Sequence, residues 1–324
     1  MTTTSAIAFA CAFLVTLVLT PVVAVVLHRA GHLDVPNERS SHSTAVPRGG
    51  GLACTAGVVI GLLVARPELS DVGYTALAAV TLLTVVGYLD DHLSLSSSTR
   101  LLVQLSAGAL MGAPIGVGWA IVASGVFVVL VNCVNFMDGI NGLTSATMLG
   151  WGLTATYVAG SEGIPLLGVL GLVTAATALG FLPWNAPRAH LFLGDVGSYL
   201  YGGLVAAGTV LAVQAGVPVA VTLAPLTLYL FDVGLTLVRR LGRRARILDA
   251  HREHIYQRLS GELGLSHTMV ALYISTLNVT VIALWLWAPT SLALGLTGTV
   301  LLVYACSVTL GTHVLVRHPE RQAS

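Results

Sequence analysis

Long apolar runs recur along almost the whole sequence, and they limit what the chain can fold into. Only 9% of the 324 residues are charged, whereas a soluble domain carries about 25% charged residues. Such a chain cannot cover a water-facing surface, so we expect an all-α, polytopic membrane protein that forms a single integral membrane domain over residues 1–324. Runs near the ~20 residues that a spanning helix needs number about eleven: 5–27, 51–66, 73–90, 101–114, 116–135, 143–160, 164–183, 197–214, 217–239, 268–288 and 291–316.

The placement of arginine predicts the orientation. All fifteen basic residues are arginines, and with eleven spans and an external N-terminus only Arg66 lies outside. Basic residues concentrate in cytosolic loops, so we expect the N-terminus outside and the C-terminus in the cytosol. No basic segment precedes the first apolar run, which is therefore expected to be a retained helix and not a signal peptide. The loops expected in the cytosol cover about 28–50, 90–100, 136–142, 184–196 and 240–267, and they carry nearly all the polar residues.

Three aspartates stand at the edges of apolar runs. Asp90 and Asp91 are adjacent and follow the run that ends at Val86, where like charges repel and a charge near hydrocarbon is costly. Asp195 lies between two glycines in FLGDVGS, just before another run. Mg²⁺ prefers one or two carboxylates together with phosphates and water, so the pattern indicates a divalent-cation site. A solvated helix end for the pair and a helix N-cap for Asp195 are the simpler alternatives.

An amide-rich turn follows the predicted span 116–135. Its sequence NCVNFMDGINGL contains Asn132, Asn135, Asp138 and Asn141. Each asparagine side chain both donates and accepts hydrogen bonds, which suits the edges of a nucleobase or a sugar. A plain turn between two helices explains Asp138 and the glycine after it, but it does not explain the two earlier asparagines.

Two basic segments could bind an anion. In HREHIYQRL, His251 and His254 are three residues apart, so they would share a face of a helix, and Arg252 lies between them. Arginine and histidine together favour a phosphate; zinc binding and attraction to acidic lipids are the alternatives. In the first loop, the phosphate-binding candidates are Arg39, His42 and Arg48.

One further acid lies inside a predicted span. Asp232 falls within 217–239, and an intramembrane acid usually faces a cavity or a partner. Arg239 or Arg240, within two helical turns of Asp232, is a candidate partner, so Asp232 is expected to be a supporting residue.

Five motifs, taken in their order, resemble the polyprenyl-phosphate N-acetylhexosamine-1-phosphate transferase family, glycosyltransferase family 4. They are DVPNERSSHSTAVPRGGG, GYLDDHLSLSSSTRLLVQ, NCVNFMDGINGL, FLPWNAPRAHLFLGDVGSYLYGG and HREHIYQRL. The resemblance implies transfer of an amino-sugar 1-phosphate from a UDP-sugar to a polyprenyl phosphate, such as undecaprenyl phosphate, with release of UMP. It also implies Mg²⁺, or Mn²⁺ in its place, as cofactor.

The resemblance assigns roles to residues of this sequence. Asp90, Asp91 and Asp195 would be catalytic, with Asp91 and Asp195 holding the metal. The nucleotide would bind at Asn132, Asn135, Asp138 and Asn141. Phosphate or sugar would bind at His251, Arg252 and His254, with Arg39, His42 and Arg48 as further candidates.

Two departures concern the branch of the family. The peptidoglycan branch carries a histidine run in its last loop and a lysine near its second helix, whereas this chain has HREHIYQRL and contains no lysine. The sequence is more similar to the enzymes that initiate O-antigen or teichoic acid, which implies a UDP-N-acetylglucosamine or 6-deoxy donor at the plasma membrane. A homodimer is compatible with the sequence.

Two rival classes need a test. In a transporter or channel, Asp90, Asp91 and Asp232 would form a proton or cation path. A catalytically inert lipid-binding scaffold is the other rival. Most acids are expected at one face of the membrane, which argues against the transporter, and the intact Asp90, Asp91 and Asp195 argue against the scaffold.

Overall fold

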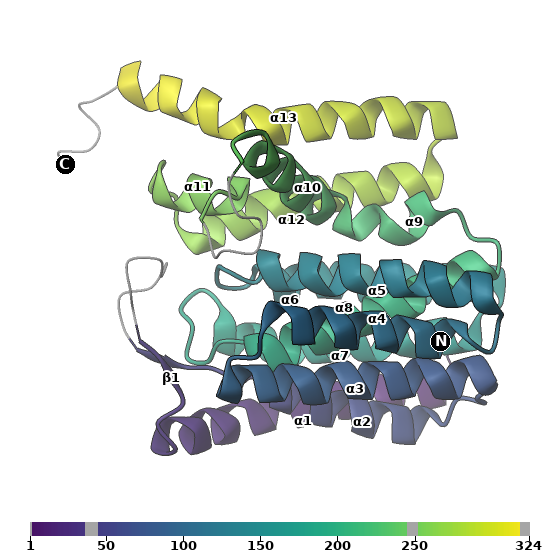
Figure 1. Ribbon diagram of the computed structural model, residues 1–324. Helices are drawn as coiled ribbons and strands as arrows, with labels where there is room; N and C mark the ends of the chain where they lie inside the picture. Colours follow the sequence, from purple (N-terminus) through teal and green to yellow (C-terminus); the bar gives the residue numbers. More distant parts are fainter. Residues whose placement is uncertain (1, 36–44, 245–251, 318–324) are drawn as a thin grey trace.

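The computed structural model describes residues 2–35, 45–244 and 252–317, with side chains up to residue 312. Most of the chain is a bundle of long helices (Figure 1). The first half consists of α1 (Thr3–Arg29), β1 (Leu33–Asp34), β2 (Val46–Pro47), α2 (Gly51–Ala65), α3 (Asp71–Leu93), α4 (Ser97–Gly112) and α5 (Val117–Met137). The second half consists of α6 (Leu143–Glu162), α7 (Pro165–Asn185), α8 (Gly194–Gln214), α9 (Val219–Leu223), the 3₁₀ turn η1 (Ala224–Leu226), α10 (Thr227–Gly242), α11 (Ile255–Gly261), α12 (His267–Trp287) and α13 (Thr290–Arg317).

Helix α8 lies at the centre of the bundle. In its most apolar 18-residue stretch, 94% is buried inside the protein, compared with 22% in the corresponding stretches of α1 and α13. Helices α2, α3, α5 and α7 all contact it. A Cβ at Gly202 would lie 2.7 Å from Cα of Val131 in α5, so small residues let these helix backbones approach closely, as in other membrane bundles.

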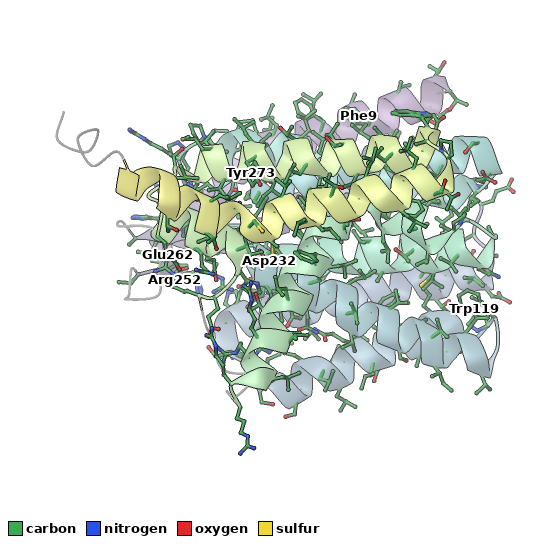
Figure 2. All side chains as sticks on the ribbon, turned by 90° about the horizontal axis from the view of Figure 1, so that it is seen from above. Phe9, Trp119, Asp232, Arg252, Glu262 and Tyr273 are labelled. Atoms are coloured by element: carbon green, nitrogen blue, oxygen red, sulfur yellow. The ribbon has the colours of Figure 1, made fainter. Side chains whose placement is uncertain are left out.

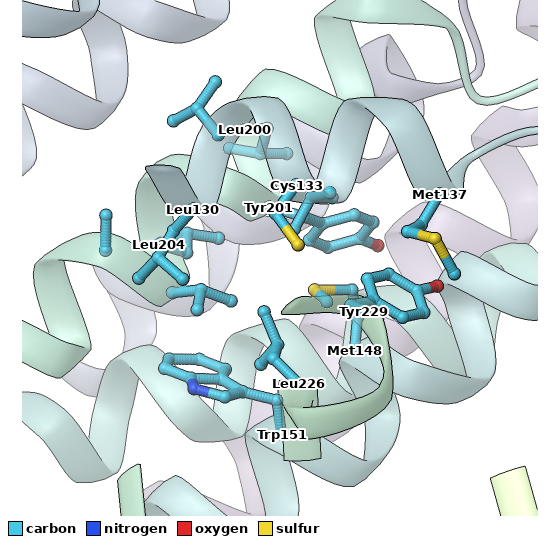
Figure 3. Packing of buried hydrophobic residues seen from close by; sticks show 14 of the residues in the cluster. Leu130, Cys133, Met137, Met148, Trp151, Leu200, Tyr201, Leu204, Leu226 and Tyr229 are labelled. Atoms are coloured by element: carbon cyan, nitrogen blue, oxygen red, sulfur yellow. The ribbon is translucent and has the colours of Figure 1, made fainter. Parts of the chain in front are cut away.

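The core beside α8 is formed by segments far apart in the sequence. Figure 3 shows Leu130, Cys133 and Met137 of α5 packing near Tyr201 of α8 and Tyr229 of α10. The third side of this cluster comes from Met148 and Trp151 of α6 and Leu226 of η1. This packing fixes the ends of α5, α8 and α10 relative to one another.

The expected eleven spans are confirmed only in part. Within the described residues, eight helices are long and apolar enough to cross a membrane: α1, α3, α5, α7, α8, the α9–α10 segment, α12 and α13. Helix α2 has 15 residues, which gives about 23 Å of helix against a hydrocarbon core of about 30 Å. Helix α4 has 16 residues and begins with the polar sequence SSTR, and α6 is rich in threonine and glycine. A multi-pass, all-α membrane protein is therefore confirmed, whereas the number eleven is not.

Two local features differ from a purely helical expectation. The span predicted at 217–239 is interrupted by η1, which contains Pro225, because proline lacks the amide that would continue the helical ladder. The first loop contains a short antiparallel pair, with Leu33 opposite Pro47 and Asp34 opposite Val46. This pair and α11 lie at the same end of the bundle, on the left in Figure 1.

Candidate active site

The carboxylate of Asp91 accepts hydrogen bonds from the first turn of the central helix, α8. The backbone amides of Asp195 and Val196 donate to its two oxygens, each at 2.9 Å. The first amides of a helix have no partner within the helix, and a negative charge is favoured there. Asp91, which lies in the last turn of α3, therefore caps α8, and its side chain is only 4% exposed.

Glycines make this contact possible. Gly194 has φ +78°, and a Cβ there would lie 2.7 Å from Oδ2 of Asp91. A Cβ at Gly87 of α3 would overlap the carbonyl of Asp195. The N-cap residue of α8 is Leu193, and Asp195 lies inside the first turn. The alternative in which Asp195 serves as an N-cap is therefore wrong.

Arg48 joins the two aspartates. Its Nε lies 3.0 Å from Oδ1 of Asp91, and its Nη2 lies 2.9 Å from Oδ1 of Asp195. Burial opposes the charged guanidinium, but the carboxylates of Asp195 and Asp91 outweigh burial and hold the pKa of Arg48 above its usual value. The Arg48 side chain is 41% exposed, so this ion pair is open to solvent on one side.

The backbone before α8 holds Arg48 in place. Phe192 donates its amide to the carbonyl of Pro47 at 2.9 Å, and its carbonyl accepts from Gly49 and Gly50 at 3.1 and 2.8 Å. These bonds bring together two segments more than 140 residues apart in the sequence. The PRGG stretch of the first loop thus lies directly against the FLGD stretch, and this contact brings Arg48 to Asp195.

The two asparagines of the amide-rich motif have different surroundings. Nδ2 of Asn135 donates to Oδ1 of Asp195 at 2.7 Å and to Oγ of Ser198 at 3.0 Å. Nδ2 of Asn132 instead donates to Oε1 of Gln104 in α4 at 2.6 Å. Asn135 thus belongs to the carboxylate cluster and orients Asp195, whereas Asn132 contributes to the packing of α4 against α5.

The turn after α5 lies beside the same cluster. Burial raises the pKa of Asp138 to about 7, although the Thr144 hydroxyl and Arg48 act in the opposite direction. Nδ2 of Asn141 donates to the carbonyl of Pro187 at 3.2 Å, and the amide of Asn141 contacts Nδ1 of His267 at 3.4 Å. The turn is therefore tied to the α7–α8 loop and to the start of α12.

Asp90 points away from the Asp91–Asp195–Arg48 cluster, because neighbouring helical residues point about 100° apart. Its Oδ1 accepts the amide of Leu95 at 2.8 Å, and its Oδ2 lies 3.4 Å from Nη1 of Arg100 and 3.3 Å from the Tyr199 hydroxyl. Arg100 was not among the predicted site residues, although it lies in the same motif, ten residues after Asp90. The three aspartates lie at one end of the bundle, but Asp91 and Asp195 contact Arg48, whereas Asp90 contacts Arg100.

The last predicted loop differs most from expectation. Helix α11 begins at Ile255, and His254 is its N-cap residue, so His254 does not lie inside a helix. His254 is 2% exposed, and its Nδ1 lies 3.2 Å from Oδ1 of Asp232. The candidate partner of Asp232, an arginine of the same helix, is wrong, since Arg240 pairs with Glu253.

The remaining phosphate-binding candidates are placed only in part. Arg252 is exposed near the end of the bundle (Figure 2). Arg39, His42 and His251 lie outside the described residues, so their predicted roles stay predictions.

The donor set fits a magnesium ion held by two carboxylates. In the part of the chain that the structure describes, no group of three or more His, Cys, Asp or Glu side chains is arranged to hold a metal, so a third carboxylate ligand is not found there. Asp91 and Asp195 nevertheless converge on one cation, the guanidinium of Arg48. Two carboxylates are sufficient for Mg²⁺ when substrate phosphates and water complete its octahedron.

Comparison with known proteins places the chain in a family. Residues 74–214, which include all three aspartates, match the model for glycosyl transferase family 4. A probable undecaprenyl-phosphate N-acetylglucosaminyl 1-phosphate transferase of Bacillus subtilis is 31% identical over 83% of this chain and 80% of its own length. A decaprenyl-phosphate N-acetylglucosaminephosphotransferase of Mycobacterium leprae is 28% identical over 81% and 78%.

A third relative agrees. An undecaprenyl-phosphate alpha-N-acetylglucosaminyl 1-phosphate transferase of Thermotoga maritima is 28% identical over 78% of this chain and 81% of its own length. All three relatives are transferases by name, and none is a transporter. The chain therefore belongs to glycosyl transferase family 4, the family of polyprenyl-phosphate N-acetylhexosamine-1-phosphate transferases.

Proposed function

We propose that this protein transfers N-acetylglucosamine 1-phosphate, or a 6-deoxy relative, from a UDP-sugar to a polyprenyl phosphate and releases UMP. The names of the three relatives support the donor and acceptor classes. The single observation that carries the proposal is the convergence of Asp91 of α3 and Asp195 of α8 on Arg48 at one end of a helical bundle. The site would begin assembly of a lipid-linked cell-envelope glycan.

The reaction joins two anions, so it needs positive charge. Mg²⁺ held by Asp91 and Asp195 would neutralise the donor diphosphate and stabilise the UMP leaving group. Asn135 orients Asp195 through Nδ2. Arg48 already reaches both carboxylates with a partly exposed side chain, so its guanidinium is placed to exchange a carboxylate contact for a phosphate contact.

Asp90 and Arg100 form the proposed contact for the acceptor. The Arg100 side chain is 32% exposed, and Asp90 lies next to it at 3.4 Å. We propose that Asp90 orients Arg100 toward the acceptor phosphate. A phosphate monoester is largely ionised at pH 7, because its second pKa is about 6, so the acceptor oxygen can attack the donor phosphorus directly. No covalent intermediate with the protein is then required.

The position of the site explains the choice of a lipid acceptor. The three aspartates lie at the ends of apolar helices, where the surface of a bilayer would be if these helices span it. There a phosphate head can reach a soluble nucleotide-sugar while its prenyl tail stays among lipid chains. We further propose that this end faces the cytosol in the plasma membrane, in agreement with the arginine distribution; a homodimer stays a prediction from the sequence.

A reconstituted transfer assay tests the proposal. Purified protein in lipid nanodiscs would be given a panel of UDP-sugars and one polyprenyl phosphate, with UMP release and lipid-linked product as readouts. We expect product with Mg²⁺ or Mn²⁺ and none in excess chelator or with Asp91→Asn. The matched control is Asp71→Asn, because Asp71 begins the same helix at its far end and is exposed. Full activity in chelator would exclude the metal, and UMP release without a lipid product would exclude the transferase.

A further inference from the structure

A second acidic centre lies deeper in the protein and is not part of the Asp91–Asp195–Arg48 cluster. Asp232 of α10 is completely buried, and Figure 2 shows it among the helices, with Arg252 and Glu262 nearer the end of the bundle. A buried carboxylate is costly unless it is paired and hydrogen-bonded. Among the ion pairs of the described residues, Asp232 is matched with His254, so most of the compensation must come from neutral donors.

Five donors converge on the Asp232 carboxylate. Oδ1 accepts the amide of Ile255 at 2.9 Å and contacts Nδ1 of His254 at 3.2 Å. Oδ2 accepts the Tyr304 hydroxyl at 2.7 Å and the amide of Tyr256 at 3.2 Å. The fifth donor is the Thr236 hydroxyl, one helical turn away at 3.3 Å. Carboxylates that accept several N–H bonds are stabilised in the charged form, so this network accounts for a buried acid without an arginine.

The network joins three elements that are separate in the sequence. Asp232 belongs to α10, Tyr304 to α13, and three of the donors to the beginning of α11. His254 completes a capping box with Gln257 at the same point. The first turn of α11 therefore has its position set by a side chain of another helix.

Helix α11 in turn packs against the turn after α5. The Tyr256 hydroxyl donates to the carbonyl of Phe136 at 2.9 Å, and a Cβ at Gly139 would overlap that hydroxyl. The rings of His254 and Phe136 lie 6.3 Å apart, and those of His254 and Tyr256 are stacked at 5.8 Å. Phe136 directly follows Asn135, which orients Asp195. A continuous chain of contacts thus runs from Asp232 to the carboxylate pair.

We infer that Asp232 is a positioning residue for the nucleotide-sugar site: it fixes the His254 ring and the start of α11 against the turn after α5. Because the Asp232 carboxylate acts only as an acceptor in this network, Nδ1 of His254 carries the proton and Nε2 has the lone pair. The inference rests on the proposed function for its kinetic consequence, but the structural coupling is independent of the function.

A double-mutant cycle provides the kinetic test. Asp232→Asn and His254→Gln should each raise the KM for the UDP-sugar about tenfold, which corresponds to about 1.4 kcal/mol, and leave the KM for the polyprenyl phosphate unchanged. The double variant should resemble either single variant, because residues that act through one another are not additive. A hundredfold rise in the double variant would overturn the inference, as would equal losses for both substrates. Asp71→Asn is the control.

Hydrogen exchange supplies a readout that does not need activity. In Asp232→Asn, the amides of residues 255–259 and those of residues 136–142 should exchange faster together, while those of the α3 and α8 cores stay unchanged. Faster exchange at 255–259 alone would overturn the coupling to the turn. If wild-type protein transfers no sugar phosphate, the proposed function fails, and the exchange experiment still decides this inference.

A milder variant tests the inference if Asp232→Asn fails to fold. Should Asp232→Asn not fold, Tyr304→Phe removes one donor and keeps the charge. It should give the same exchange pattern at smaller amplitude, and an unchanged pattern in both segments would contradict the inference.

Discussion

Two carboxylate centres of this protein solve the same electrostatic problem in different ways. At the end of the bundle, Asp91 and Asp195 share an arginine whose side chain is 41% exposed. In the interior, Asp232 is 0% exposed and is compensated mainly by backbone amides and hydroxyls. A partly exposed cation can be exchanged for a metal or a phosphate, whereas a buried set of neutral donors cannot. The first centre is therefore suited to chemistry and the second to holding elements in place.

The largest expected effect separates the two centres by activity. Asp195→Asn removes a charge that faces both Arg48 and the proposed metal, so we expect a loss of at least about 1,000-fold in turnover, or about 4 kcal/mol of transition-state stabilisation. The melting temperature should change little, because asparagine can still accept a bond from Asn135. Initial rates and thermal unfolding of the same preparation measure both quantities. Residual activity above one tenth of wild type would remove Asp195 from the mechanism.

The converse change should act on stability. Asp232→Ala leaves several buried donors without an acceptor, and the expected cost is about 3 kcal/mol in the free energy of unfolding. Asp91→Ala should cost less, because the Arg48 side chain is 41% exposed and can be solvated when it loses this partner. Denaturant unfolding of both variants in the same detergent compares them. Equal costs would mean that the two centres do not differ as described.

Arg48 gives a prediction with opposite signs in two measurements. In the structure its guanidinium occupies the carboxylates that the metal would need. Without substrate, Arg48→Ala should therefore bind Mg²⁺ about tenfold more tightly, or about 1.4 kcal/mol, as followed by metal-dependent thermal stabilisation. Transfer activity should nevertheless fall, because the phosphate contact is lost. Weaker Mg²⁺ binding in Arg48→Ala would show that Arg48 supports the ion and does not compete with it.

The smallest expected effect concerns pH. The pKa of Asp138 is raised to about 7 in the folded protein from about 3.9 in an unfolded chain. The protonated form is thus favoured by folding, and its stabilisation is complete below the unfolded pKa and is lost as the pH rises through about 7. Between pH 6 and pH 8 the wild type should lose about 1 kcal/mol relative to Asp138→Asn. Parallel stability profiles of the two proteins would contradict the raised pKa.

Much of the candidate site could be predicted because it lies in short motifs. The adjacent aspartates, the acid between glycines and the PRGG stretch each deviate locally from an apolar background, and the structure brings Asp91, Asp195 and Arg48 together. Helix positions were predictable for the same reason, since apolar length needs no tertiary information. The number of spans was harder to predict, because α2, α4 and α6 are short or polar and depend on their neighbours for burial.

The errors share one cause, which is that side-chain direction and distant partners are invisible in a pattern. Asp90 and Asp91 were expected to differ in role, but the neighbours of Asp90, which are Arg100 and Tyr199, could not be seen in the sequence, because successive helical positions point in different directions. The partner of Asp232 was sought one or two turns away, whereas it lies more than twenty residues further on, at the start of α11. Asn132 and Asn135 share a motif, yet only Asn135 reaches the carboxylate pair.

The sequence by itself determined that this chain spans a membrane and which chemical groups it places at the ends of its helices, because hydropathy and residue type are local properties. The tertiary structure decided which of those groups meet. Asp91 caps α8, Arg48 joins two acids from different helices, and Asp232 holds α11, because contacts between segments far apart in the chain depend on how the helices pack and on where glycines let backbones approach.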